Sequence, residues 1–185
     1  MLDSRPPLHE YQQTGVEWLR SVGRGLLGDE PGLGKSRQLI EASTGRTLVV
    51  APAMVITGGT WRDEIARWAD DPSRFTIAPY TSLNKRVKTG NGSATRPTDA
   101  VKPEYLKPWD TLIVDEAHYI KGRKTSWTKA VSEIATLSDR VYLATGTPIA
   151  NWAPELFTLL RVLNPEQAKR GQDLGSYWRW GGTWF

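Results

Sequence analysis

The sequence predicts an α/β domain in three layers, with a mainly parallel central sheet and helices on both of its faces. Short apolar runs alternate along the chain with segments of helical periodicity, and each run is nearly continuous, as in strands buried on both faces. Polar motifs follow directly on three of these runs. In a parallel sheet such motifs meet at the carboxyl ends of the strands, so we expect one ligand site at that rim.

Strands are expected where an apolar run is short and rich in β-branched residues. The segment TLIVDEA has the strongest β character of these runs. The first run is the shortest and leads directly into a glycine-containing motif. In chain order, the expected strands are 25–28, 47–52, 75–80, 111–117 and 140–147.

Helices are expected where apolar residues recur at intervals of three and four positions. The third of them places Trp61, Ile65 and Trp68 on one face, which predicts that this face is buried. The last is opened by Pro154 and closed by Pro165, which are favourable positions for proline at a helix start and after a helix end. In chain order, the expected helices are 8–22, 35–43, 61–69, 125–137 and 154–163.

Composition limits the class of protein. The 185 residues suffice for one domain with its own core, and they include no cysteine, which excludes disulfides and Cys-ligated zinc. His9 and His118 lie far apart in the sequence, so a histidine-based metal site is not expected. The chain has no apolar run of about 18 residues for a membrane span, and its first residues lack the apolar core of a signal peptide. We therefore expect an intracellular protein, cytoplasmic or nucleoid-associated, with no membrane partner.

Two segments stand outside the alternating pattern. Residues 85–108 are rich in Gly, Pro, Thr and basic residues without periodicity, and we expect an irregular basic insertion there. Its basic side chains either contact phosphates or form an ordinary solvated surface. The tail 166–185 ends in aromatic residues, which either pack on this domain or form the start of a linker or interface. The basic residues of the insertion are Lys85, Arg86, Lys88, Arg96, Lys102 and Lys107, and the tail aromatics include Trp178, Trp180, Trp184 and Phe185.

The first polar motif, DEPGLGKS at 29–36, has the features of a phosphate-binding loop. Its glycines allow a tight turn in which successive backbone N–H groups point at phosphate oxygens, and the following helix adds its positive end. Lys35 would reach the β- and γ-phosphates, and the Ser36 hydroxyl would bind Mg²⁺. Asp29 stands where the common pattern has glycine, so a glycine-containing turn before an ordinary helix is the alternative. The predicted nucleotide-binding residues of the loop are Asp29, Glu30, Pro31, Gly32, Leu33, Gly34, Lys35 and Ser36.

The second motif, IVDEAH at 113–118, places two carboxylates at the end of a strand. Asp115 can hold Mg²⁺, partly through water, and Glu116 can polarise the water that attacks the γ-phosphate. An acidic turn after a strand is the alternative. The phosphate loop about 80 residues upstream favours the catalytic interpretation.

The third motif, ATGTP at 144–148, offers the hydroxyl groups of Thr145 and Thr147 around the flexible Gly146. A segment of this kind can sense bound phosphate and transmit its presence to another face of the domain. The alternative is a plain turn between a strand and a helix.

These motifs, in this order, resemble the first lobe of superfamily-two (DEAH-box) helicases, and most closely their Swi/Snf-type translocase branch. The resemblance covers residues 8–165, and it implies a RecA-like P-loop fold with ATP and Mg²⁺ as cofactors. Aspartate is usual at the first loop position in that branch, which accounts for Asp29, while Pro31 departs from the more familiar methionine. The resemblance also implies that Gln12 reads the purine and that His118 couples the ATP site to the third motif.

The same resemblance implies contacts with double-stranded DNA through its phosphate backbone, with little sequence specificity. The segment LVVAPAMVITGGTWRDEIARW is similar to one DNA-contact motif, YTSL to the next, and the residues after DEAH to a lysine-containing continuation. The DNA-binding residues expected from it are Pro52, Trp61, Thr81, Ser82 and Lys121.

Motors of this branch need two lobes, and the second lobe supplies arginines to the ATP site. Residues 1–165 are expected to form the first lobe, and nothing after Pro165 resembles the second, which would join in cis or in trans. The chain is therefore expected to bind ATP–Mg²⁺ weakly, to hydrolyse it poorly and not to translocate alone. One alternative is a stand-alone, nucleotide-regulated DNA-binding module with negligible hydrolysis. A P-loop kinase or nucleotide transferase is a weaker alternative, because no lid or acceptor site is evident.

Overall fold

The computed structural model describes residues 5–89, 95–122, 124–147 and 153–165. Within these residues a five-stranded sheet has the order β1-β7-β6-β2-β3, and each of its ladders is parallel. This confirms the predicted mainly parallel sheet. The strands are β1 (Arg24–Leu27), β2 (Thr47–Ala51), β3 (Phe75–Pro79), β6 (Trp109–Val114) and β7 (Ser138–Ala144).

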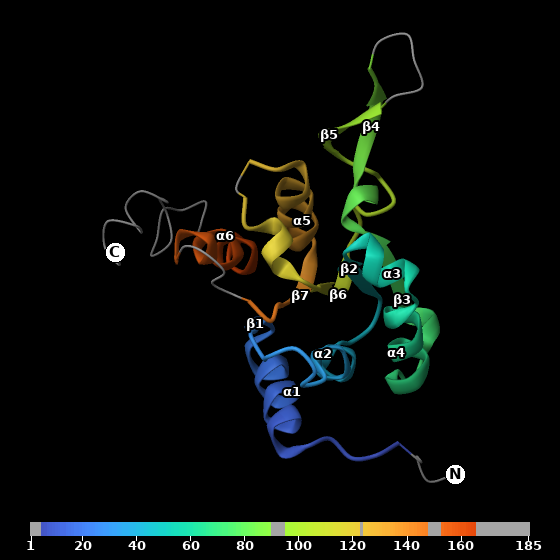
Figure 1. Ribbon diagram of the computed structural model, residues 1–185, viewed down its shortest axis with the longest axis vertical. Helices are drawn as coiled ribbons and strands as arrows, with labels where there is room; N and C mark the ends of the chain where they lie inside the picture. Colours follow the sequence, from blue (N-terminus) through green and yellow to red (C-terminus); the bar gives the residue numbers. More distant parts are fainter. Residues whose placement is uncertain (1–4, 90–94, 123, 148–152, 166–185) are drawn as a thin grey trace.

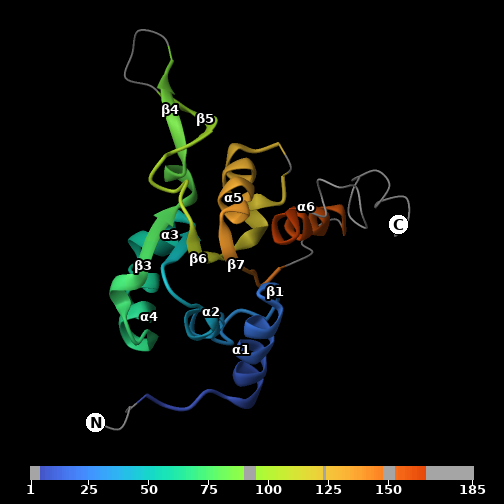
Figure 2. The same cartoon turned by 180° about the vertical axis from the view of Figure 1, so that it is seen from behind.

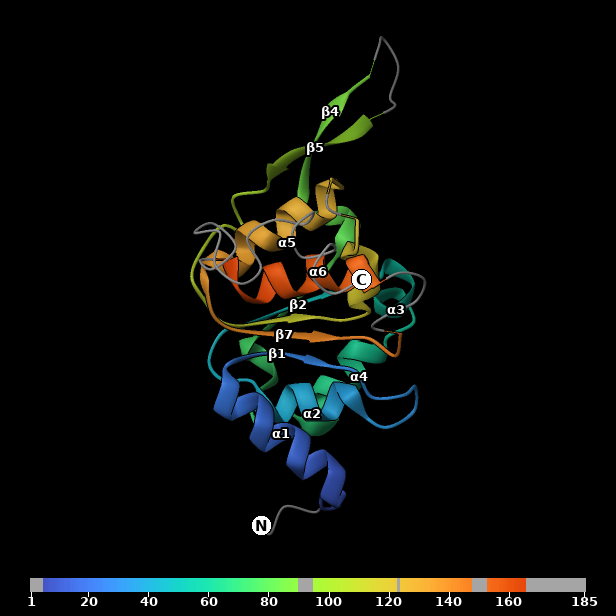
Figure 3. The ribbon, with the colours of Figure 1, turned by 90° about the vertical axis from the view of Figure 1, so that its left-hand side faces the viewer.

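Helices cover both faces of this sheet, which gives the three expected layers (Figure 3). One face carries α1 (Glu10–Val22), α2 (Lys35–Ala42) and α4 (Thr60–Trp68), and the other carries α5 (Ser126–Thr136) and α6 (Ala153–Leu163). A short helix, α3 (Ala53–Thr57), follows β2 directly. No helix among the described residues is long and apolar enough to cross a bilayer.

Each central strand contributes to two hydrophobic cores, because successive side chains of a strand point to opposite faces. Val49 of β2 packs in the core formed with α1, α2 and α4, whereas Leu48 and Val50 pack in the core formed with α5 and α6. Every residue of β2 is buried. The predicted buried face of α4 is confirmed, since Trp61, Ile65 and Trp68 are its buried residues.

The strands end earlier than the sequence predicts, at the start of each polar motif. β6 stops at Val114 rather than residue 117, and β7 stops at Ala144 rather than residue 147. At the end of β6 the backbone N–H of Glu116 donates to the Asp115 carboxylate, and Glu116 adopts a positive φ. The polar residues therefore leave the sheet and turn into the rim. Short 3₁₀ helices, η1 (Pro72–Arg74), η2 (Tyr80–Ser82) and η3 (Ala117–Ile120), complete the connections.

The prediction of an irregular segment at 85–108 is wrong at 85–88 and 95–101, which belong to two strands. Strands β4 (Asn84–Lys88) and β5 (Thr95–Val101) pair antiparallel into a ribbon, here called the arm, which projects from the body (Figures 1 and 2). Sequence periodicity marks a strand only when one of its faces is buried. The arm is exposed along most of its length, and only Asn84 and Val101 at its root are buried.

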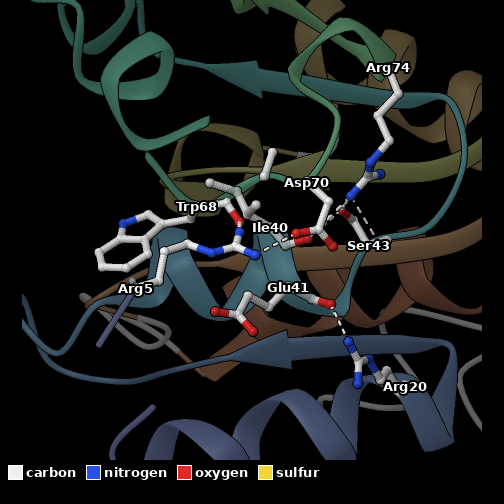
Figure 4. Close-up of a pocket in the computed structure, with 9 residues that line it drawn as sticks. Arg5, Arg20, Ile40, Glu41, Ser43, Trp68, Asp70 and Arg74 are labelled. Atoms are coloured by element: carbon white, nitrogen blue, oxygen red, sulfur yellow. Dashed lines mark hydrogen bonds and ion pairs between the residues drawn. The ribbon is translucent and has the colours of Figure 1, made fainter. Parts of the chain in front are cut away.

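The C-terminal end of α2 is held by arginines from outside the helix (Figure 4). The last carbonyls of a helix lack partners in a following turn, and cations are favourable there. Arg20 donates to the Glu41 carbonyl at 2.6 Å, and Arg74 donates to the carbonyl of Ser43 at 3.3 Å and to its hydroxyl at 2.9 Å. Arg5 lines the same cleft of about 170 Å³ and donates to the Trp68 carbonyl at 2.7 Å. The helix that begins in the phosphate loop is thus anchored at its far end.

Candidate nucleotide site

The three polar motifs meet at the rim, as expected from a parallel sheet. They follow β1, β6 and β7, and β7 lies between the other two in the sheet. His118 Nδ1 lies 3.1 Å from Thr145 Oγ1, which joins the second motif to the third. A Cβ atom at Gly146 would lie 3.0 Å from Cδ of Pro31, so the third motif also packs closely against the phosphate loop.

The phosphate loop curls around its own lysine. Lys35 Nζ donates to the backbone carbonyls of Asp29, at 2.7 Å, and Glu30, at 3.0 Å. Gly32 and Gly34 have positive φ values of 88° and 71°, a region that residues with a Cβ rarely adopt. Gly34 is the N-cap of α2 and provides no side-chain cap for the first N–H groups of the helix. These N–H groups, together with Lys35, form a donor set that suits phosphate oxygens.

The residues present also fit a magnesium ion held jointly with phosphate. Ser36, in the first turn of α2, offers a hydroxyl, and Asp115 at the end of β6 offers a carboxylate. Mg²⁺ prefers oxygen ligands and is usually held by one or two protein groups together with phosphates and water. No cluster of three or more His, Cys, Asp or Glu side chains suited to a metal occurs in the part of the chain that the structure describes. A site shared with phosphate needs no such cluster.

Gln12 lies against the phosphate loop, where the resemblance predicts the purine-reading residue. Its side chain is buried, and Nε2 donates to the Leu33 carbonyl at 3.2 Å while Oε1 accepts from the His9 backbone N–H at 3.1 Å. The amide therefore links the N-terminus of α1 to the loop. A Cβ atom at Gly34 would lie 2.5 Å from Nε2, so a larger residue there would displace the end of the Gln12 side chain.

Asp115 is held at each of its polar atoms. Its Oδ1 accepts from the Glu116 backbone N–H at 2.9 Å, and its Oδ2 accepts from the Trp61 indole N–H at 2.8 Å. Its main-chain carbonyl accepts from the Tyr80 hydroxyl at 2.7 Å. Burial raises the pKa of Asp115; the hydrogen bond from Trp61 opposes this shift, and the nearby charge of Glu116 adds to it.

Glu116 and His118 extend this arrangement toward the third motif. Glu116 Oε2 lies 3.1 Å from His118 Nδ1, the same atom that lies 3.1 Å from Thr145 Oγ1. Thr145 Oγ1 in turn accepts from the Thr147 backbone N–H at 3.1 Å. The residues predicted to couple the ATP site to the third motif therefore form one chain of polar contacts.

The residues predicted to contact DNA have different surroundings. Thr81 of η2 is exposed, whereas Ser82 is partly buried and donates to the Pro79 carbonyl at 2.9 Å. Lys121 is partly buried after η3. The side chains of Pro52 and Trp61 are buried, Trp61 to 1% exposure, so any contact of these two residues with DNA would be made through their main chain. α3 and η2 follow β2 and β3, so they occupy the other half of the rim from the phosphate loop.

Besides Trp61, whose hydrogen bond to Asp115 was not predicted, two partners of the site were missed by the sequence interpretation. Tyr80 reads as the last residue of an apolar strand, and nothing in the motif indicates that its hydroxyl reaches Asp115. Gln38 Nε2 donates to Asp29 Oδ2 at 2.8 Å from within α2. Helical spacing places Gln38 one turn beyond Lys35, on the side of α2 that faces back to the loop. That spacing was the available signal.

Comparison with known proteins gives a consistent result. The family model described as the SNF2-related domain matches residues 11–179. The nuclear protein STH1/NPS1 of Saccharomyces cerevisiae is 33% identical over 183 residues, covering 86% of this chain and 13% of that protein. The ISWI chromatin-remodeling complex ATPase ISW1 of the same yeast is 30% identical, covering 92% of this chain and 17% of that protein.

The fold is similar to that of a solved ATPase core. The Sulfolobus solfataricus SWI2/SNF2 ATPase core in complex with dsDNA superposes with a TM-score of 0.72 at 24% identity, covering 96% of this chain and 39% of that chain. The present chain thus spans well under half of the solved core, and 13% and 17% of the two yeast relatives.

Proposed function

The chain belongs to the family of SNF2-related domains, and on that premise we propose that it is the ATP-binding lobe of a DNA-dependent ATPase of the helicase or translocase type. The observation that supports this most strongly is the meeting of the phosphate loop with Asp115, Glu116 and Thr145 at the ends of three neighbouring strands. The relatives are named as ATPases and helicases, and the proposal extends that activity to this site.

In the proposed reaction each residue has a separate task. The first N–H groups of α2 and Lys35 bind the phosphates, and the Lys35 ammonium moves from the loop carbonyls to the β- and γ-phosphate oxygens. Ser36 and Asp115 would hold Mg²⁺, Asp115 partly through water; the ion supplies positive charge that neutralises the phosphates. Glu116 orients the attacking water and accepts its proton. His118 passes the state of the phosphates to Thr145 in the third motif.

A second RecA-like lobe, in cis or in trans, completes this site in our proposal. The solved core that the chain resembles is more than twice as long, which supports the idea that the lobe works as part of a larger motor. An arginine from a partner surface contributes about 10³–10⁵ to the rate of phosphoryl transfer in related reactions. The lobe alone is therefore expected to hydrolyse ATP slowly, and coupling of hydrolysis to movement on DNA is expected only with the second lobe.

Double-stranded DNA is the proposed macromolecular partner, bound through its phosphate backbone. The rim segments α3 and η2 lie beside the nucleotide half of the sheet, and the arm begins directly after η2. Lys85, Lys88 and Arg96 of the arm are exposed, while the acidic Asp99 is paired with Lys129 at 2.5 Å. The arm therefore presents an excess of positive charge next to the segments predicted to contact DNA. One relative is named as a nuclear protein, which fits an intracellular location beside DNA.

Calorimetry on the whole chain tests the nucleotide site. Saturable binding of ATP–Mg²⁺ is expected, and Lys35→Ala should weaken it at least about tenfold, because the phosphates then lack a charge-assisted hydrogen bond from the ammonium. Lys88→Ala, which removes an equal charge from the exposed arm, is the matched control and should bind like the wild type. Equal affinity of Lys35→Ala and wild type would contradict the assignment.

A further inference from the structure

Asp115 accepts hydrogen bonds from two residues outside the three motifs, Trp61 of α4 and Tyr80 of η2. Trp61 is the second residue of α4, which follows α3, and its indole N–H reaches the Asp115 carboxylate at 2.8 Å. Tyr80 opens η2, next to the exposed Thr81, and its hydroxyl reaches the Asp115 main-chain carbonyl at 2.7 Å. Both rings are buried at 1% exposure, so neither is available to solvent or to DNA.

Hydrogen bonds determine the orientation of the carboxylate. The Glu116 N–H fixes Oδ1 and the Trp61 N–H fixes Oδ2, so rotation of the carboxyl group would break one of the two hydrogen bonds. The indole ring of tryptophan carries one hydrogen-bond donor and no acceptor. A buried donor without a partner costs free energy. Trp61 and Asp115 therefore hold each other in place. Removing the hydrogen-bond partner of a metal-binding side chain typically lowers metal affinity by about 10–100-fold.

Tyr80 extends the contact toward the remainder of the site. Its ring stacks on that of Tyr119 with centroids 5.7 Å apart, and Tyr119 lies 4.9 Å from the ring of His118. A displacement of η2 would therefore move the hydroxyl that binds the Asp115 main chain. It would also move the ring that stacks on Tyr119, beside the His118 contact with Thr145.

We propose that Trp61 and Tyr80 are positioning residues that set the Asp115 carboxylate for Mg²⁺, and that contact of DNA with α3 and η2 acts through them on metal affinity. This rests on the proposed function, in which Asp115 is a metal ligand. It assigns to Trp61 the role of linking the DNA half of the rim to the metal, in place of a direct contact with DNA. By linkage, DNA should then strengthen or weaken metal binding by the same factor as metal changes DNA binding.

The first experiment compares two tryptophans of the same helix. Trp61→Phe keeps a buried ring and removes the N–H, and Trp68→Phe does the same to the hydrogen bond from Trp68 Nε1 to Glu64 Oε2 at 3.0 Å. Mn²⁺ affinity, measured by electron paramagnetic resonance with a non-hydrolysable ATP analogue present, should fall about tenfold in Trp61→Phe and stay unchanged in Trp68→Phe. Binding of the analogue without metal should stay unchanged in both. Equal Mn²⁺ affinities in Trp61→Phe and wild type, or equal losses in the two variants, would overturn the role of Trp61.

A measurement on the wild-type chain covers the case in which Trp61→Phe does not fold. The Trp61 indole ¹⁵N–¹H resonance should shift when Mg²⁺ is added to the nucleotide-bound protein, whereas that of Trp68 should not. An unchanged chemical shift of the Trp61 indole on addition of Mg²⁺ would refute the proposal.

The second experiment tests the route from η2. Tyr80→Phe removes the hydroxyl that reaches Asp115, and Tyr105→Phe removes a hydroxyl 3.1 Å from Ser82 Oγ as the matched control. A short DNA duplex should change Mn²⁺ affinity in the wild type and in Tyr105→Phe, and change it less in Tyr80→Phe. An identical response in Tyr80→Phe and wild type would overturn this part. If the wild type binds no ATP–Mg²⁺ at all, the proposed function itself fails, and that result is distinct from each outcome above.

Discussion

Glu116 holds the proposed water-activating carboxylate in a strained backbone conformation. Its φ of 48° and ψ of 51° place it in the left-handed region, and among the described residues it is the one residue other than glycine with a positive φ. A side chain in that region costs roughly 1–2 kcal/mol. Such strain persists where the surroundings fix it, and it is concentrated at functional sites. The turn brings Glu116 out of β6 toward His118.

Two replacements of Glu116 that both remove the carboxylate measure the backbone strain by itself. Glu116→Gly should be more stable than Glu116→Gln by about 1 kcal/mol, because glycine adopts the left-handed region without the steric cost. The free energy of unfolding, measured in urea for both variants, checks this. A Glu116→Gly variant less stable than Glu116→Gln would show that the turn is unstrained.

The same residue gives the clearest test of turnover. Glu116→Gln should bind ATP–Mg²⁺ like the wild type and release phosphate about 100-fold more slowly, as expected when a general base is removed. Radiolabelled phosphate release under single-turnover conditions measures this. Unchanged release would assign the water activation to another group.

For single residues, the sequence predicted those members of the candidate site that are neighbours along the chain. Lys35 and Ser36, or Asp115 and Glu116, can be found because their spacing within a motif reflects their chemistry. For Trp61 the helical periodicity correctly predicted a buried face, but not the hydrogen-bond partner of the indole. The resemblance assigned it to DNA, and the hydrogen bond to Asp115 spans 54 positions, beyond what local spacing reveals.

At the scale of elements, α2 is fixed at both ends by different means. Its N-terminus emerges from the phosphate loop, and its C-terminus is capped by arginines. Arg74 is the most connected of them, since it also donates to the Gly45 carbonyl at 3.0 Å and the Thr47 hydroxyl at 2.9 Å. Burial lowers the pKa of Arg74, which the nearby charges of Asp71 and Asp70 partly offset.

Loss of the Arg74 cap should weaken the whole domain. Arg74→Ala is expected to lower the free energy of unfolding by about 2–3 kcal/mol, because several buried carbonyl and hydroxyl groups lose a charged donor. Arg62→Ala removes an exposed arginine of α4 and should change stability by less than about 0.5 kcal/mol. Urea denaturation of both variants measures the difference, and similar stabilities would contradict the capping role.

Most strands and helices were predictable because each has a buried face whose period appears in the sequence. The arm was not, because a ribbon exposed on both faces needs no apolar alternation. The basic residues of the arm are the feature that the sequence does reveal, and their part in DNA binding can be tested on the whole molecule.

For the whole molecule, binding of duplex DNA should depend on salt through the arm. Replacing Lys85, Lys88 and Arg96 by Gln should reduce the slope of log affinity against log salt by about 0.9 for each phosphate that the arm no longer neutralises. Arg86 is left in place because it donates to Thr95 across the ribbon at 2.8 Å and 2.9 Å. Arg46→Gln lowers the net charge at the amino end of β2, on the opposite edge of the sheet from the rim, and should leave the slope unchanged. Fluorescence anisotropy at several salt concentrations measures it, and an unaltered slope in the arm variant would exclude phosphate contacts there.

The order of strands has a consequence for how the chain folds. β1, which leads into the phosphate loop, lies at the edge of the sheet, so β7 is its one neighbour there. The two strands pair from Arg24 with Val141 to Leu27 with Ala144, positions far apart in the chain. Contacts between such distant residues form slowly and late in folding. On the ribosome, the phosphate loop would be synthesised early, but β1, which precedes it, could join the sheet only after β7 has been synthesised. The proposed ATP site would then form only after the chain has been synthesised as far as Ala144.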